Sequence, residues 1–264
     1  MAIILREAGY TYPDGSEAVR SVDLHVDDGE RLAIVGQNGA GKTTMVKMMN
    51  GLLEPTRGEV LVDGSTTRGR TTASIAKTVG YVFQNPDDQV FNRDVRTELE
   101  FMPRYHGWDE RKRAERVERA AALAGISRHL DTNPKDLPFA TRKFVAIAAV
   151  LVGECGYVIL DEPTAGLDVV GLSLLNRMID QLEADGVAVV TITHDMRFVV
   201  ESFSRVVAMA DGNVVADGGC AEVFSDDAVL AEARIKRPEV AQLARDLGLS
   251  STALTIRDVA PLIP

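Results

Sequence analysis

A glycine-rich octapeptide is the part of the sequence whose spacing most directly predicts chemistry. GQNGAGKT, residues 36–43, fits the pattern G-x-x-x-x-G-K-[ST] and stands between an apolar strand and a helix. Glycines let backbone N–H groups curl around phosphate oxygens, and the start of the helix adds a favourable field. Lys42 can then reach the β- and γ-phosphates of a triphosphate, and the Thr43 hydroxyl can ligate Mg²⁺. The loop predicts a phosphate site; the alternative is a glycine-rich turn that binds nothing.

Two adjacent acids end an apolar run further along the chain. VILDEP, residues 158–163, places Asp161 and Glu162 at the end of a predicted strand. Because side chains alternate across a strand, the two carboxylates cannot do the same work. Asp161 suits the Mg²⁺ side of the site. Glu162 suits polarising the water that attacks the γ-phosphate, a general-base contribution of typically ~10²–10⁴-fold. Such a pair is common by itself, so the prediction depends on its combination with the phosphate loop.

Other phosphate-loop proteins fit the remaining sequence less well. Small GTPases need Asn-Lys-x-Asp, and the chain offers only NPKD, residues 133–136, with its lysine in a different place. Small-molecule kinases rarely carry the Asp-Glu pair with a long downstream segment. Here PTAGLD follows the acids, a second apolar strand ends at His194, and YVFQN ends a strand at Gln84.

This combination resembles the ATP-binding cassette (ABC) ATPases over about residues 2–235. The resemblance implies ATP and Mg²⁺ as cofactors, a D-loop that ends at Asp168, a switch histidine at His194, and a Tyr12 ring stacked on adenine, worth about 1–3 kcal/mol. Core packing is the alternative for Tyr12 and for His194. The implied nucleotide-binding residues are Tyr12, Gly36, Gln37, Asn38, Gly39, Ala40, Gly41, Lys42, Thr43 and Thr44; the implied catalytic residues are Glu162, His194 and Gln84; the implied metal ligands are Thr43, Gln84 and Asp161.

YVFQNPDDQVF, residues 81–91, narrows the resemblance to the ATPases of energy-coupling factor (ECF) transporters, including the cobalt- and nickel-importing group. RPEVAQLARDLGL followed by LTIRDV also resembles the short helical tail of that group. In this frame Asp87 and Asp88 lie near the groove that receives the coupling helix of a transmembrane subunit, where an arginine finds an acidic partner. The alternative is that the two acids only cap a helix.

The family's signature, Leu-Ser-Gly-Gly-Gln, is replaced here by Leu-Pro-Phe-Ala-Thr, residues 137–141. In the family, the signature serine and glycines contact the γ-phosphate held by the other subunit. Pro138 has neither hydroxyl nor N–H, and Phe139 is bulky where glycine allows close approach. Proline is tolerated in a first helical turn, so we expect the helix to form. The resemblance therefore favours a heterodimer with a second ATPase that has an intact signature; a homodimer, or a drifted signature with slow turnover, remains the alternative.

The elements that must position these residues follow from the apolar patterning. Residues 33–35, 158–160 and 187–192 are nearly continuous apolar runs, typical of parallel strands covered on both faces. Earlier runs alternate more and predict an antiparallel sheet. We expect helices at 43–52, 109–124, 137–151 and 171–184, and a hairpin that turns at 211–213. The predicted fold is α/β: a phosphate-loop NTPase core with an N-terminal antiparallel β-subdomain, a helical subdomain at about 86–150, a nucleotide-binding domain at 1–235, and a helical extension at 236–264.

Composition limits the setting of the protein. Its 264 residues carry 29 Lys+Arg against 39 Asp+Glu, which argues against a broad nucleic-acid surface. The N-terminus meets a charge too early for a signal peptide. The longest apolar run, residues 144–152, is short of the ~20 residues that a spanning helix needs. Cys155 and Cys220 lack metal-ligand spacing, and Cys155 is expected to be a buried thiol. We expect a peripheral protein at the cytoplasmic face of the cell membrane, without a covalent anchor.

The leading interpretation is an ATPase subunit that energises an ECF-type importer of a metal ion, such as cobalt or nickel, or of a vitamin. Two alternatives remain. One is a soluble cassette protein of translation or DNA repair, although such proteins usually fuse two cassettes or carry long or basic inserts. The other is a regulatory nucleotide-binding module with little turnover, favoured by the altered signature and disfavoured by Glu162 and His194.

Overall fold

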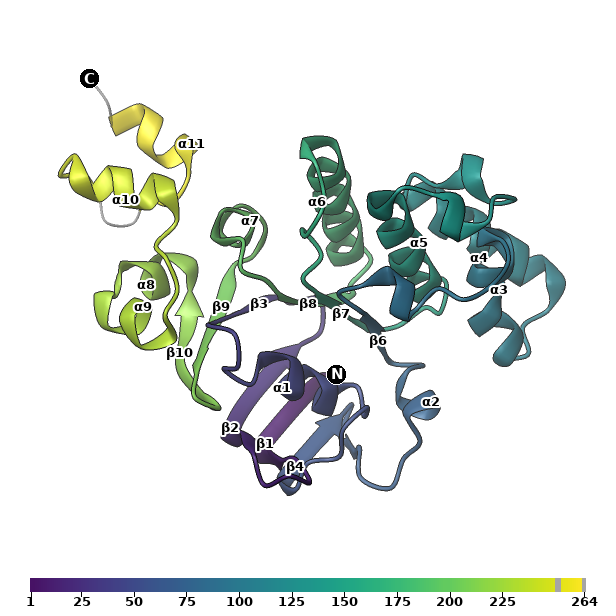
Figure 1. Cartoon of the computed structure of the whole chain (residues 1–264), viewed down its shortest axis with the longest axis horizontal. Coiled ribbons are helices and arrows are strands. Elements are labelled where there is room, and N and C mark those ends of the chain that lie inside the picture. Colours follow the sequence, from purple (N-terminus) through teal and green to yellow (C-terminus); the bar gives the residue numbers. More distant parts are fainter. Residues whose placement is uncertain (250–252, 263–264) are drawn as a thin grey trace.

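The computed structural model describes residues 1–249 and 253–262 and contains two separate sheets (Figure 1). The larger sheet has the order β10-β9-β3-β8-β7-β6. Its strands β9, β3, β8, β7 and β6 run parallel, and β10 is antiparallel to β9. The strands are β3 (Arg31–Val35), β6 (Val79–Val82), β7 (Tyr157–Asp161), β8 (Ala188–Ile192), β9 (Arg205–Ala210) and β10 (Asn213–Gly219).

The parallel strands in the centre of this sheet are fully buried. Every residue of β6, β7 and β8 is buried, as expected of strands covered on both faces. The carboxyl ends of parallel strands meet at one edge of the sheet, where ligands bind in open α/β folds. The loops after β3, β6, β7 and β8 therefore meet there. These are the loops that carry the residues with predicted chemistry.

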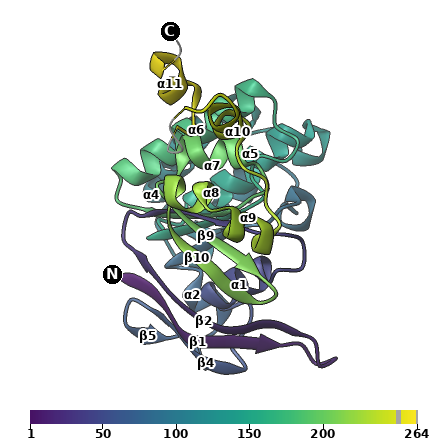
Figure 2. The same cartoon turned by 90° about the vertical axis from the view of Figure 1, so that its left-hand side faces the viewer.

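The smaller sheet is the predicted antiparallel β-subdomain, with the order β2-β1-β4-β5. Its first two strands are longer than the sequence runs indicated, because both continue beyond their apolar cores and pair over most of their length. Figure 2 shows this sheet on one side of the larger sheet and most helices on the other. Between the sheets, α1 contributes Met45, Met48 and Met49 to one hydrophobic core. The strands are β1 (Ala2–Thr11), β2 (Glu17–Asp27), β4 (Arg57–Val62) and β5 (Ser65–Thr66).

The helices fall into groups that occupy different ends of the molecule. In Figure 1, α3, α4 and α5 form a helical subdomain at one end, and α10 and α11 lie at the other. The helices are α1 (Lys42–Met49), α2 (Thr72–Ile75), α3 (Val95–Tyr105), α4 (Glu110–Leu123), α5 (Phe139–Leu151), α6 (Val169–Ala184), α7 (Met196–Ser202), α8 (Cys220–Ser225), α9 (Asp227–Ala233), α10 (Glu239–Asp246) and α11 (Ile256–Val259), with 3₁₀ turns at 86–88, 127–129, 134–136 and 260–262.

Caps set several helix boundaries that patterning alone missed. We predicted a helix from 171, but α6 begins at Val169 because the Asp168 carboxylate accepts the Gly171 N–H at 2.8 Å. The helix predicted to reach residue 52 ends at Met49, with Asn50 as its C-cap. The hairpin predicted to turn at 211–213 is confirmed, although Asn213 already pairs with Ala210 and the turn itself is residues 211–212. Cys155 and Cys220 are both buried free thiols, as expected for Cys155.

The C-terminal segment is helical, as predicted, and has a small core of its own. That core contains Ala244, Ala253 and Val259. The Asp227 carboxylate of α9 accepts hydrogen bonds from Arg237 at 2.9 Å and from Arg245 at 2.7 Å, which ties the segment to the rest of the fold. Within residues 1–249 and 253–262, no helix combines the length and apolarity needed to cross a bilayer.

Candidate nucleotide site

A cavity of about 640 Å³ opens at the carboxyl edge of the larger sheet, between the two sheets. Two of the fourteen predicted site residues, Gly36 and Gln37, do not line it. Sequence reasoning missed Ala18 and Ile192, which do; both are apolar and carry no motif. The lining residues are Tyr12, Ala18, Asn38, Gly39, Ala40, Gly41, Lys42, Thr43, Thr44, Gln84, Asp161, Glu162, Ile192 and His194.

Two glycines of the phosphate loop are required by its conformation. Gly36 has φ +147°, and a Cβ there would lie 2.3 Å from the Met209 carbonyl oxygen. Gly41 has φ +99°, and its Cβ would lie 2.3 Å from the Ala18 carbonyl oxygen. Neither position can hold a side chain without moving the backbone. The loop is thereby seated tightly against neighbouring strands with its amides at the start of α1, the arrangement that binds phosphate.

Lys42 is folded over its own loop in this structure. Its ammonium donates to the carbonyl oxygens of Gly36 at 2.7 Å and Gln37 at 2.8 Å. Burial lowers the pKa of Lys42, while the nearby charges of Glu162 and Asp161 oppose that shift. Gly36 and Gln37 thus belong to the site through the lysine, although they do not face the cavity.

Asp161 is held by a residue that the sequence analysis did not single out. The Tyr81 hydroxyl donates to Asp161 Oδ2 at 2.7 Å, and both side chains are buried. Burial, followed by the Asp161 charge, raises the pKa of Tyr81, so the phenol stays protonated as a donor. Because Tyr81 lies on β6 three residues before Gln84, the only available signal was its strand position beside β7.

Glu162 and His194 contact one another at the end of β7 and β8. His194 Nε2 lies 3.2 Å from Glu162 Oε1, and the His194 backbone N–H donates to Glu162 Oε2 at 3.3 Å. Burial raises the pKa of Glu162. Burial and the Lys42 charge lower the pKa of His194. A neutral imidazole can donate from Nε2 to the carboxylate, which orients it inside the cavity.

Tyr12 and Gln84 lie at the edges of the cavity. The Tyr12 hydroxyl is 3.1 Å from the Thr44 hydroxyl, and its ring packs edge-on against Tyr10. Tyr12 is 36% exposed, so a flat partner in the cavity can reach its side chain. Gln84 is exposed at the end of β6 and reaches the same cavity.

The donor set of the cavity fits Mg²⁺. Thr43, Gln84 and Asp161 supply a hydroxyl, an amide carbonyl and a carboxylate, and Mg²⁺ prefers such oxygen ligands in combination with substrate phosphates. Among the described residues there is no cluster of three His, Cys, Asp or Glu that could bind a metal by itself. The metal would therefore need oxygens from a bound phosphate.

The altered signature begins α5 as predicted, with Pro138 as N-cap and without a side-chain cap. Phe139 faces the D-loop: a Cβ added to Gly166 would lie 3.0 Å from its ring. Four residues on, the Lys143 ammonium donates to the carbonyl oxygens of Glu162 at 2.9 Å and Ala165 at 2.8 Å. The sequence analysis missed Lys143, because nothing in its local pattern marks a buried lysine.

Asp87 and Asp88 lie in a 3₁₀ turn whose cap is Asn85, which accepts the Asp87 N–H at 3.2 Å. Capping is therefore not their function here. Asp87 pairs with Arg142 of α5 at 3.0 Å.

Beside this turn lies an apolar groove of about 250 Å³ that contains two exposed phenylalanines, packed edge-on 5.0 Å apart. Residues along the groove include Leu52, Tyr81, Phe83, Phe91, Phe101, Met102 and Val150.

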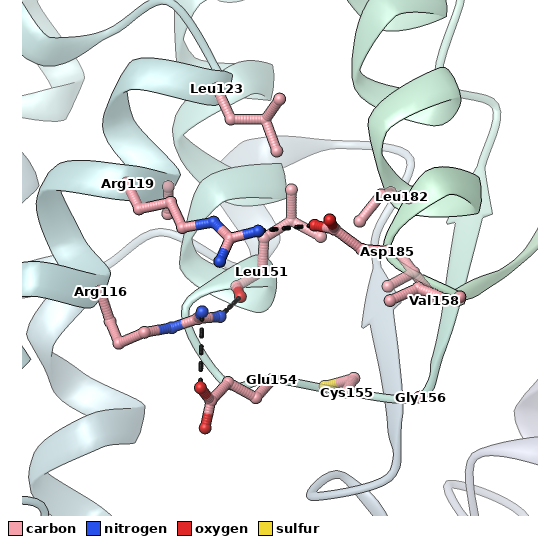
Figure 3. Close-up of a pocket in the computed structure, with 13 residues that line it drawn as sticks. Arg116, Arg119, Leu123, Leu151, Glu154, Cys155, Gly156, Val158, Leu182 and Asp185 are labelled. Carbon is pink, nitrogen blue, oxygen red and sulfur yellow. Dashed lines mark hydrogen bonds and ion pairs between the residues drawn. The ribbon is translucent and has the colours of Figure 1, made fainter. Parts of the chain in front are cut away.

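Another cavity, of about 470 Å³, lies between α4, α5 and α6 (Figure 3). Arg119 pairs with Asp185 at 2.7 Å, and Arg116 lies 3.4 Å from Glu154. Arg116 also donates to the Leu151 carbonyl oxygen at 3.3 Å. Each guanidinium thus already has an acidic partner. We therefore interpret this cavity as part of the interface between the helical subdomain and the core and not as a ligand site.

Comparison with known proteins agrees with this geometry. The family model described as ABC transporter matches residues 19–165. A putative ABC transporter ATP-binding protein of Pyrococcus furiosus is 40% identical over 91% of both chains. The energy-coupling factor transporter ATP-binding protein EcfA of Methanothermobacter thermautotrophicus is 35% identical over 97% of this chain and 83% of the relative. The solved structure of CbiO1 from Clostridium perfringens, described as part of the ABC transporter complex CbiONQ, is 32% identical over 92% of this chain and 98% of its own, with a TM-score of 0.79.

Proposed function

The chain belongs to the ABC transporter family of ATPases, and from that premise we propose that it is the ATP-binding and ATP-hydrolysing subunit of an ECF-type importer. The single observation that carries the proposal is one cavity lined by the phosphate loop, Asp161, Glu162 and His194. The similarity to EcfA and to CbiO1 over nearly the whole chain supports the ECF type. A metal ion such as cobalt or nickel, or a vitamin, is the proposed cargo.

In this proposal the residues of the cavity divide the work of phosphoryl transfer. Amides of residues 36–43 bind the triphosphate, and Lys42 exchanges its loop carbonyls for the β- and γ-phosphate oxygens. Bound Mg²⁺ would supply electrostatic stabilisation of the transferred phosphoryl group. Thr43, Gln84 and Asp161 would hold that metal. The Tyr12 ring would stack on adenine.

Glu162 is the proposed general base. Its raised pKa brings it nearer the operating pH, where a base is most effective. The contact with His194 orients its carboxylate, and His194 would also sense the γ-phosphate. This assigns proton acceptance to Glu162 and orientation to His194.

We propose that residues 1–235 are the nucleotide-binding domain and that the apolar groove beside Asp87 and Asp88 receives a helix of a transmembrane subunit. Exposed Phe91 and Phe101 would be covered by that helix. Because Arg142 already engages Asp87, an incoming arginine would share that carboxylate. The protein would then sit peripherally at the cytoplasmic face of the membrane.

A second ATPase is the proposed partner in closing the nucleotide site. Pro138 offers no N–H or hydroxyl to the partner's γ-phosphate, and Phe139 is turned toward the chain's own D-loop. A heterodimer with a paralogue that has an intact signature would leave ATP on this chain in the competent site. A homodimer would have two weakened sites.

The test is ATP hydrolysis by the purified chain, alone and with its paralogous ATPase, together with co-purification of a membrane subunit. We expect slow hydrolysis alone and a marked increase with the paralogue. Brisk hydrolysis by the isolated chain without gain from the paralogue would contradict the heterodimer. Failure to bind any membrane subunit would contradict the importer.

A further inference from the structure

Lys143 is a buried cation in an unusual setting. Its side chain is 1% exposed, and within the described part of the chain no carboxylate lies within ion-pair distance of its ammonium. Lysines are almost never fully buried unless paired. Here two carbonyl oxygens, those of Glu162 and Ala165, are its hydrogen-bond acceptors. The ammonium thus donates its hydrogen bonds to the backbone of one short segment, residues 162–165.

The first residue of that segment, Glu162, has an unfavourable backbone conformation. Glu162 has φ +47°, in the left-handed region, where a non-glycine residue costs about 1–3 kcal/mol and persists only if its surroundings hold it. The Glu162 N–H donates to the Ile192 carbonyl oxygen at 2.8 Å. Its carbonyl oxygen accepts from Lys143 at 2.9 Å. The peptide groups on both sides of the Glu162 side chain are therefore held, one by β8 and one by α5.

Phe139 acts on the same segment from the same face of α5, because residues four apart are neighbours on a helix. Its ring covers Gly166, where an added Cβ would lie 3.0 Å from the ring. The Lys143 ammonium lies 5.6 Å from the centre of that ring, within cation–π range. The first five residues of α5 thus contact residues 162–166 through two side chains.

We propose that Lys143 is a positioning residue for Glu162: from the second turn of α5 it holds the Glu162 and Ala165 carbonyl groups, and Phe139 closes over Gly166 beside it. The inference rests on the proposed role of Glu162 as the base. It gives the altered signature segment a function within its own chain.

The test compares Lys143→Met with the wild-type chain in two measurements. Hydrogen exchange of the Ala165 and Leu167 amides, followed without partner or nucleotide, is expected to accelerate several-fold. Single-turnover hydrolysis of MgATP with enzyme in excess is expected to slow by about 10²-fold, since small misplacement of a reacting group costs that much. The Kd for MgATP should stay near the wild-type value, because Lys143 does not line the nucleotide cavity.

Lys112→Met is the matched control, because the Lys112 ammonium pairs with Glu154 and packs over Trp108, away from Glu162. It should change neither measurement. Lys143→Arg keeps a cationic donor and should retain most of the wild-type hydrogen-exchange protection and hydrolysis rate. Lys143→Gln should give values between those of Lys143→Arg and Lys143→Met. If Lys143→Met does not fold, the Arg and Gln variants decide: equal exchange rates in these two would overturn the proposal.

Unchanged exchange and rate in a folded Lys143→Met variant would also overturn the proposal. A loss of rate matched by an equal loss of MgATP affinity would do so too. Because exchange is measured on the chain alone, its outcome does not depend on transport. A chain that shows the exchange effect but binds no membrane subunit would contradict the proposed function and leave this inference standing.

Discussion

At the scale of single residues, the site works through a few contacts that fix where charge lies. The Glu162 carboxylate contacts His194, and the Asp161 carboxylate accepts a hydrogen bond from Tyr81. The Lys42 ammonium donates to loop carbonyl oxygens that a phosphate can replace. Each contact uses a buried or half-buried polar group, where hydrogen bonds count for more than in water. Two substitutions separate the roles of binding and hydrolysis.

Glu162→Gln should abolish hydrolysis and keep binding. The amide cannot accept the proton of the attacking water, so kcat is expected to fall by about 10²–10⁴-fold. The shape of the cavity is unchanged, and MgATP should therefore accumulate on the protein. Phosphate release and filter binding measure the two effects. Glu183→Gln is the control, because Glu183 pairs with Arg31 outside the cavity. If Glu162→Gln hydrolyses ATP at a rate near that of the wild type, Glu162 is not the general base.

Tyr81→Phe should weaken the response to Mg²⁺. The change removes the donor to Asp161 Oδ2, and loss of such a supporting group typically lowers metal affinity by about 10–100-fold. This loss of metal affinity is measured as the Mg²⁺ concentration that half-saturates binding of a fluorescent ATP analogue. Tyr157→Phe is the matched control, because its buried ring lies on β7 and its hydroxyl bonds Asp28 and Asp63 instead. An unchanged Mg²⁺ requirement would show that Tyr81 does not orient Asp161.

At the scale of elements, parallel strands and helix starts bring the residues together. β3, β6, β7 and β8 end at one edge, so their following loops share a cavity although they are far apart in sequence. α1 begins directly at the phosphate loop, and α5 reaches the same region from the helical subdomain. The start of each helix is therefore a point where a local change should have a defined effect on the site.

Gly41→Ala should damage both stability and binding. The left-handed conformation at φ +99° costs about 1–2 kcal/mol for a non-glycine residue, and the Cβ would meet the Ala18 carbonyl oxygen at 2.3 Å, so α1 must shift. Thermal unfolding and ATP-analogue binding measure the outcome. Gly64→Ala shares a left-handed φ of +74° but meets nothing within 4 Å and lies outside the cavity. It should lose stability only, and equal binding by both variants would contradict this account.

At the scale of the whole molecule, the nucleotide cavity lies between the helical subdomain and the C-terminal helices α10 and α11. The apolar groove lies where the helical subdomain meets the core, and α10 and α11 lie at the end of the molecule opposite that subdomain (Figure 1). Function at this scale depends on both ends staying attached to the core.

Asp227→Asn should loosen the C-terminal segment. The carboxylate bridges Arg237 and Arg245, and hydrogen bonds from Arg245 and then Arg237 hold the pKa of Asp227 well below its usual range. A depressed pKa means that the bridge is formed above the ordinary carboxyl range and is lost only as pH falls through the lowered value. Limited proteolysis within residues 239–249 should accelerate several-fold.

Asp246→Asn is the control, because Asp246 accepts a hydrogen bond from Gln242 within the same helix. It should leave the cleavage rate close to that of the wild type. Equal rates for Asp227→Asn and the wild type would mean that apolar packing alone attaches the segment.

The sequence by itself determined the fold class and most of the candidate site. A phosphate loop and an acidic strand end are local patterns: their spacing along the chain already carries the chemistry, and parallel strands must bring their ends together. Twelve of the fourteen predicted residues line one cavity. Caps shifted helix boundaries by up to three residues, because a capping hydrogen bond such as that of Asp168 does not show in hydrophobic periodicity.

Only the tertiary structure decided which residues support the site from behind. Tyr81 reaches Asp161 across eighty positions of sequence, and Lys143 reaches Glu162 from another helix. An arginine of a partner remains a prediction for Asp87, and the fold adds Arg142 of the same chain, which no local pattern indicated. Such contacts depend on the distance between elements that are remote in sequence. A phenol, a buried ammonium or an ion pair acquires its role from the packing of those elements, which no local pattern contains.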